Sequence, residues 1–150
     1  MLDAKISQDS ESFMADFIER NADELARNWL RIVRNHQLTR SYGAFDEGKL
    51  FERAKTVYLQ LVRWLRREIS KADLEAMFMA LGATRRREGF YLAEVIRALI
   101  VTRRVLWFKI QAERLLGSAM DPQVALDLNN RVVLFFDRAL YFTTLGFEKQ

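Results

Sequence analysis

Residues 92–116 read LAEVIRALIVTRRVLWFKIQAERLL, and this stretch indicates the architecture of the whole chain. Apolar side chains recur at helical spacing along one side of it, as at Val95 and Leu99, and along the other side, as at Val101 and Val105. A helix that is apolar nearly all the way round lies inside a bundle, because other helices must cover each of its faces. The stretch therefore predicts a central helix in a helical domain.

The rest of the chain shows the same period, and no stretch alternates apolar and polar residues as a half-buried strand does. Asp46, Ser70 and the pair Asp121-Pro122 are expected to begin helices, and Gly89 and Gly117 to end them. The sequence thus predicts an all-α bundle of six helices, the last two the longest. The expected helices cover about residues 9–19, 22–35, 46–68, 70–87, 92–116 and 121–145, and the first two can form one bent helix.

The composition agrees with one folded domain of 150 residues, of which 50% are hydrophobic and 29% are charged. A disordered chain would hold fewer apolar residues, and a β-sandwich would need many more turn residues than one proline and six glycines. The absence of cysteine excludes a disulfide framework and a thiolate zinc site. Residues 1–150 are therefore expected to form a single helical domain.

The sequence predicts a cytoplasmic protein without a membrane span. Its amino terminus lacks the basic start and the apolar run of a signal peptide. No uncharged run approaches the ~18 residues that a membrane helix needs. The best candidate, residues 95–110, is interrupted by Arg97, Arg103, Arg104 and Lys109.

Basic residues gather in the middle of the chain. The net charge is +4, and residues 49–118 hold fifteen basic and seven acidic side chains. Such a balance suits an acidic partner, but Glu68 and Glu88 stand directly beside the arginine clusters. Solvated helix faces therefore explain clusters such as Arg85-Arg86-Arg87 better than a nucleic-acid surface does, and we expect no nucleic-acid partner.

No group of residues suggests catalysis or a bound cofactor. The single histidine, His36, lies at the predicted end of a helix, where a solvated or capping role is expected. The Glu-x-x-His pairs of helical metal sites do not occur, and neither does a phosphate-binding glycine loop or a nucleophile with a partner base. We therefore expect a protein that is not an enzyme and that holds no metal, haem or other cofactor.

Two arginines on the central helix suggest a polar site within the bundle. Arg97 and Arg104 lie two turns apart, and a buried arginine requires a carboxylate partner. Glu94 and Asp137 are the candidate partners. The four side chains would form structural ion pairs or line a pocket for an anion. A carrier or sensor of a fatty-acid-like apolar anion is therefore the alternative function.

The last predicted helix carries one more apolar stripe than an internal core requires. Leu126, Val133, Leu140 and Phe147 recur every seven residues, and Phe136 lies on the same side. A seven-residue apolar repeat usually meets another helix, and two copies related by a twofold axis would bury it against itself. These five residues are therefore the expected seam of a homodimer.

Three stretches of the chain resemble a known family in their order and separation. They are ARNWL at 26–30; REGFYLAEVIRAL at 87–99, continuing to RRVLW at 103–107; and FFDRAL at 135–140 with GFE at 146–148. From about residue 22 to 148 the sequence resembles the amino-terminal domain of RsbRD-type RsbT co-antagonist proteins. That domain also heads some bacterial histidine kinases and transcription regulators. Tyr91 replaces a proline that the family pattern usually has.

The resemblance implies a sensory input domain without catalytic activity. Related stressosome proteins have amino-terminal domains of globin-like fold that bind no haem and dimerise. The helix in the position of the globin haem-binding helix, residues 71–87, has no histidine here. We therefore expect a globin-like six-helix bundle that acts in bacterial stress or two-component signalling. It would work by dimerisation and by contact with a signalling protein that the sequence does not identify.

Overall fold

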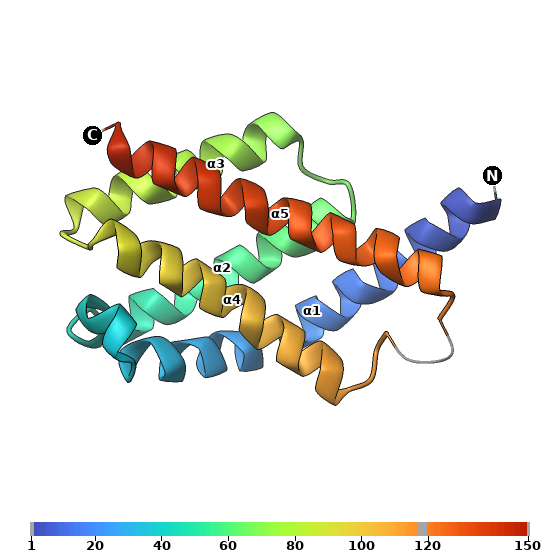
Figure 1. Ribbon diagram of the computed structural model, residues 1–150, viewed down its shortest axis with the longest axis horizontal. Helices are drawn as coiled ribbons and strands as arrows, with labels where there is room; N and C mark the ends of the chain where they lie inside the picture. Colours follow the sequence, from blue (N-terminus) through green and yellow to red (C-terminus); the bar gives the residue numbers. More distant parts are fainter. Residues whose placement is uncertain (1, 117–119, 150) are drawn as a thin grey trace.

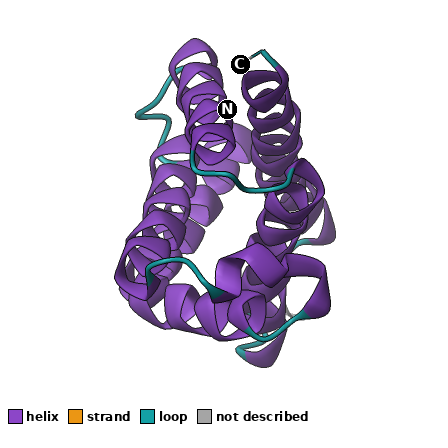
Figure 2. Cartoon of the chain, turned by 90° about the vertical axis from the view of Figure 1, so that its left-hand side faces the viewer, coloured by secondary structure: helices purple, strands orange, loops and turns teal. Residues whose placement is uncertain are grey.

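The computed structural model describes residues 2–116 and 120–149, and every regular element within these ranges is a helix. Figure 1 shows the helices gathered into one bundle, and Figure 2 shows the loops that join them. The predicted all-α fold is confirmed. Its elements are α1 (Leu2–Arg34), the 3₁₀ helix η1 (Gln37–Gly43), α2 (Glu47–Leu65), α3 (Lys71–Arg87), α4 (Leu92–Ala112) and α5 (Pro122–Glu148).

The first two predicted helices form one continuous helix, α1, as the sequence allowed. Asn21 lies inside this helix and donates from its side-chain amide to the Phe17 carbonyl at 2.8 Å. The join is helical because the buried stripe runs through it, from Ile18 through Ala22 to Leu25. With 33 residues, α1 exceeds both α5 (27) and α4 (21), so the last two helices are long but α1 is longer.

Local caps begin the helices where the sequence predicts them. Asp46 accepts a hydrogen bond from the Lys49 amide at 2.8 Å, and Ser70 accepts one from the Asp73 amide at 3.1 Å. Asp121 caps α5 in the same way. Each side chain satisfies a backbone N–H that has no partner within its helix.

Left-handed residues end three of the helices. Gly89 follows α3 with φ of 86°, in agreement with the prediction. The corresponding position is filled by Arg67 (φ 58°) after α2 and by Arg114 (φ 53°) after α4. In each case the next amide donates back to the carbonyl five positions earlier. α4 therefore ends at Ala112, earlier than expected, and Gly117, the predicted cap, lies outside the described residues.

Arg114→Gly is expected to stabilise the protein by about 0.5–1 kcal/mol, because glycine avoids the ~1–2 kcal/mol cost of a left-handed side chain and loses less than that in backbone entropy. Arg114 is exposed, so little packing is lost. Urea denaturation measures the change. Gln111→Gly is the control, since Gln111 is exposed within α4 and glycine there is expected to cost about 1 kcal/mol. A loss of stability in Arg114→Gly would contradict this helix end.

α3 and α5 lie side by side (Figure 1) and are the most extensively packed pair of helices among the described residues. Glycines lie where their backbones meet. A Cβ atom on Gly82 of α3 would lie 1.9 Å from the Thr143 carbonyl oxygen. A Cβ atom on Gly146 of α5 would lie 2.0 Å from the Met79 carbonyl oxygen. The two backbones are therefore in direct contact, and only glycine fits at either position.

α4 is central for most of its length, but other helices do not cover its whole surface. Val95 is buried on one side of the helix, and Val101 and Val105 are buried on the other. Near its carboxyl end Trp107 and Phe108 are exposed, so the expectation of an enclosed helix fails there. Even so, neither α4 nor any other helix in the described ranges is long and apolar enough to span a membrane.

Candidate functional site

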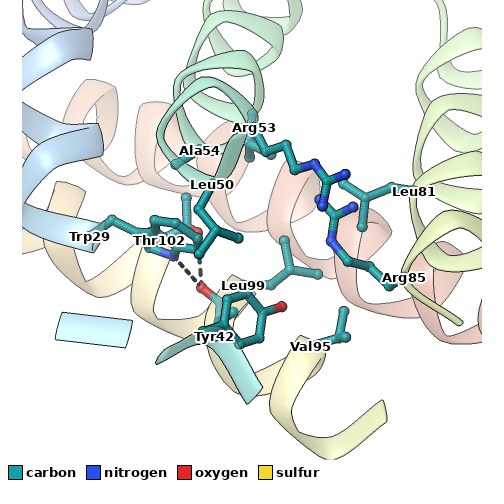
Figure 3. Close-up of a pocket in the computed structure, with 12 residues that line it drawn as sticks. Trp29, Tyr42, Leu50, Arg53, Ala54, Leu81, Arg85, Val95, Leu99 and Thr102 are labelled. Atoms are coloured by element: carbon teal, nitrogen blue, oxygen red, sulfur yellow. Dashed lines mark hydrogen bonds between the residues drawn. The ribbon is translucent and has the colours of Figure 1, made fainter. Parts of the chain in front are cut away.

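A small cavity of about 30 Å³ lies within the bundle, and α1, η1, α2, α3 and α4 all contribute to its wall (Figure 3). Most of the wall is apolar or aromatic. The side chains of Arg53 and Arg85 complete it, and their guanidinium groups lie close to each other. The remaining lining residues are Trp29, Tyr42, Leu50, Ala54, Val57, Leu81, Val95, Ala98, Leu99 and Thr102.

Glu88 is shared by both guanidinium groups. Its Oε1 accepts from Arg53 Nη1 at 2.9 Å and from Arg85 Nη1 at 3.3 Å, and its Oε2 accepts from Arg53 Nη2. Arg85 is 7% exposed, and burial, reinforced by the charge of Arg53, lowers the pKa of its guanidinium. Partial burial alone would raise the pKa of Glu88, but the hydrogen bonds and charges of the two arginines lower it. Two cations thus share one anion at the cavity.

Aromatic residues form another side of the cavity. Trp29 donates from Nε1 to the Ala98 carbonyl at 2.9 Å and so links α1 to α4. The Tyr42 ring centre lies 4.6 Å from that of Phe90 and 6.0 Å from that of Trp29. Burial raises the pKa of the Tyr42 hydroxyl, so this group stays neutral. The packed rings give the cavity a well-defined apolar wall.

The four polar residues that the sequence suggested as a site do not come together. Glu94 accepts a hydrogen bond from the Ser41 amide at 2.8 Å and so anchors η1. Arg97 is half-buried, and its Nε has no hydrogen-bond partner. Arg104 and Asp137 are exposed. Within the described ranges neither arginine forms an ion pair, because Glu94 turns to the η1 backbone and Asp137 faces solvent.

The two arginines of the cavity were missed in the sequence. Arg85 belongs to a cluster that the sequence assigns to solvent, yet only its neighbours Arg86 and Arg87 are exposed. The signal that identifies it is its helical phase, because Arg85 continues the buried stripe of α3 that begins at Leu74 and Phe78. Arg53 carries no comparable signal, since only the fold brings it to Glu88.

His36 has the capping role that the sequence predicts. It precedes η1, its Nδ1 accepts a hydrogen bond from the Leu38 amide at 3.0 Å, and its side chain is exposed. In the part of the chain that the structure describes, no three acidic or histidine side chains are grouped so that they would hold a metal ion.

The predicted seam on α5 is partly available at the surface. Leu126 is exposed, and Val133, Leu140 and Phe147 are half-buried. Phe136 is buried in the core, so its prediction as a seam residue is wrong. A seven-residue repeat drifts by about 20° per heptad around a straight helix, and the predicted stripe therefore does not follow one side of α5.

Two further apolar residues of α5, Leu134 and Tyr141, are exposed beside the predicted stripe. Phe136 instead packs against the core ring of Phe135, with the ring centres 5.1 Å apart. Apolar side chains thus recur over several turns of the outward surface of α5, with the exposed polar side chains of Asn130 and Asp137 between them. We call Leu126, Val133, Leu134, Leu140 and Tyr141 the α5 face.

A surface groove of about 360 Å³ lies between α4 and α5, beside the α5 face. Trp107 contributes to its apolar wall, and Arg103 and Arg104 line it from α4. On α5, Asp127 and Asp137 are exposed. The groove and the α5 face thus combine apolar area with basic groups on one helix and acidic groups on the other.

Residues 23–150 match the family model described as the RsbT co-antagonist protein rsbRD N-terminal domain. The chain belongs to this family. The match confirms the resemblance seen in the sequence and identifies the bundle as an RsbRD N-terminal domain, a regulatory domain of stress signalling. No curated protein and no solved structure matches the chain.

The first part of α1 precedes the region that the RsbRD family model matches, yet it is joined to the rest of the domain. Glu11 is buried, and its Oε1 lies 3.2 Å from Arg67 Nη2 and 3.3 Å from Arg131 Nε. Arg131 stacks 4.2 Å from a ring centre of Trp64 and donates from Nη2 to the Trp64 carbonyl at 2.6 Å. Burial lowers the pKa of the Arg131 guanidinium. Glu11 therefore connects α1 to α5 and to the end of α2.

Proposed function

We propose that this RsbRD N-terminal domain is a non-enzymatic sensory module that acts in the cytoplasm as a homodimer. The observation that supports the proposal is the α5 face, which leaves Leu126, Leu134 and Tyr141 exposed on one helix. Soluble monomers rarely leave a contiguous apolar surface uncovered. A second copy of the chain is the occupant we propose, and a signalling protein would respond to the paired state.

Charge complementarity favours a second copy over an unrelated partner. A twofold axis along the α5 face sets each α5 beside the α4–α5 groove of the other copy. We expect this pairing to bring the exposed Asp127 and Asp137 of one copy toward Arg103 and Arg104 of the other. Opposite charges at the rim of an apolar interface orient the two subunits.

The double variant Leu126→Glu, Tyr141→Glu is expected to be monomeric. Removing a large apolar side chain from an interface costs about 1.5–3 kcal/mol, and the two copies together lose four of them, so the dimer is weakened at least ~10⁴-fold. Sedimentation over a range of protein concentrations measures the dimer dissociation constant. Both residues are well exposed, at 58% and 62%, so the folded monomer tolerates the change.

The chain offers a matched control in Leu38→Glu, Tyr91→Glu. These residues are also a leucine and a tyrosine, 54% and 69% exposed, but they lie outside α5. The control variant is expected to dimerise like the parent. A parent that is monomeric at high micromolar concentration would rule out the dimer. Equal dissociation constants for the two double variants would show that the dimer interface does not include the α5 face.

The alternative function, a carrier of a fatty-acid-like anion, has less support. Pockets that enclose such ligands usually measure about 300–1,000 Å³, well above the 30 Å³ of the cavity within the bundle. Arg97 does not line that cavity, and Arg104 lines only the larger groove between α4 and α5, which is open at the surface and does not enclose an acyl chain. Protein–protein signalling is therefore the function that the geometry favours.

A further inference from the structure

A surface groove adjoins the small cavity within the bundle. A groove of about 190 Å³ runs between α2 and α3, and Glu52, Thr56 and Met77 form part of its wall. Four residues line both the groove and the cavity: Arg53, Val57, Leu81 and Arg85. The two guanidinium groups therefore lie between an open surface groove and an apolar interior.

The charges at this boundary are not balanced. Among the described residues, Glu88 is the single carboxylate that pairs with Arg53 and Arg85, and its Oε1 accepts hydrogen bonds from both. Arg85 is almost fully buried, and the side chains of Arg53 and Glu88 are about three-quarters buried. Two guanidinium groups that share one carboxylate leave a net positive charge at this largely buried position, and such a charge attracts a further anion. A guanidinium group also presents paired N–H donors that match the two oxygens of a carboxylate.

The apolar wall and the small volume of the cavity limit the part of the anion that extends from its carboxylate. Leu50, Val95, Leu99 and Trp29 present apolar surface to the cavity. The hydroxyl of Thr102 already donates to the Ala98 carbonyl at 3.0 Å. The cavity of about 30 Å³ has room for roughly two water molecules, which is close to the size of a short alkyl group.

We infer that this cavity binds a short-chain monocarboxylate of about two to four carbons, with the carboxylate on Arg53 and Arg85 and the alkyl group directed toward Trp29. A short-chain monocarboxylate would then be the signal that the sensory module detects, and this role rests on the proposed sensory function. Helices α2, α3 and α4 all contribute lining residues, so an occupied cavity stabilises their mutual packing.

Propionate is the probe for this site, and the side-chain resonance of Trp29 is the readout. The chain has three tryptophans, of which only Trp29 lines the cavity. In nitrogen–proton NMR spectra, sodium propionate is expected to shift the Trp29 indole signal saturably and to leave those of Trp64 and Trp107 in place. Sodium chloride at the same concentration is the ionic control.

Variants of α2 test the role of the guanidinium pair. Arg53→Gln is expected to weaken propionate binding by about tenfold or more, and Arg53→Lys is expected to retain part of it, because lysine keeps the charge without the paired donors. Arg63→Gln is the matched control, since Arg63 is an exposed arginine on the same helix. Thermal melting of each variant shows whether it folds. If Arg53→Gln does not fold, the binding test uses Arg53→Lys in its place.

Three results would overturn the inference: no saturable shift at Trp29, an equal shift with chloride, or an affinity that rises steadily from propionate to octanoate. Sedimentation of the same samples separates this inference from the proposed function. A dimer that ignores propionate would remove the inference and leave the dimer in place. A monomer that binds propionate would do the reverse.

Discussion

Gly82→Ala in α3 and Gly146→Ala in α5 are each expected to lower the free energy of unfolding by about 3 kcal/mol, near the upper end for overpacking in a close-packed core. The new methyl group would meet the carbonyl oxygen of Thr143 or Met79 at about 2 Å. A backbone carbonyl cannot rotate away as a side chain does, so the two helices must separate. This loss outweighs the roughly 1 kcal/mol that alanine adds to helix propensity.

Gly48→Ala is the control for both substitutions. Gly48 lies in the first turn of α2, and a Cβ atom there would meet only Asp46 Oδ1, at 3.4 Å. Its stability is expected to equal or slightly exceed that of the parent. The combined Gly82→Ala, Gly146→Ala variant is expected to lose less than the sum of the single losses, because the first methyl group already separates the helices. A melting temperature for Gly82→Ala equal to that of Gly48→Ala would show that the backbones are not in contact.

Glu11→Gln is expected to destabilise the domain by about 2 kcal/mol, which is below the usual cost of breaking a buried pair because Arg67 is partly exposed. The amide cannot balance the charge of Arg131, which remains buried against Trp64. Chemical denaturation measures the change. Glu19→Gln is the control, because Glu19 pairs with Arg66 at the surface and its loss is expected to have little effect.

An apolar replacement separates charge from packing at the same place. The pair Glu11→Leu, Arg131→Met removes both charges together and is expected to regain most of the stability lost in Glu11→Gln. If Glu11→Gln is no less stable than Glu19→Gln, Glu11 does not hold α1 to the rest of the domain. Limited proteolysis adds a local readout, because a released α1 end would be cleaved first.

The helices, most of their ends and the family follow from local features of the amino-acid sequence. The caps at Asp46, Ser70 and Asp121 are interactions within three residues, and the turn at Gly89 requires only a residue that tolerates a positive φ. Helical periodicity is equally local, so the sequence shows both the presence and the amphipathic side of each helix.

The cavity and the α5 face depended on tertiary structure. Arg85 resembles its exposed neighbours in sequence, and Phe136 resembles a residue of a repeating stripe, but both are buried because of what lies opposite them. The contact between Gly82 and the α5 backbone joins residues about sixty positions apart, and only the packed fold shows it. Local sequence sets which side of a helix is apolar. How two helices approach and cross decides which of those side chains meet, and that depends on every residue between them.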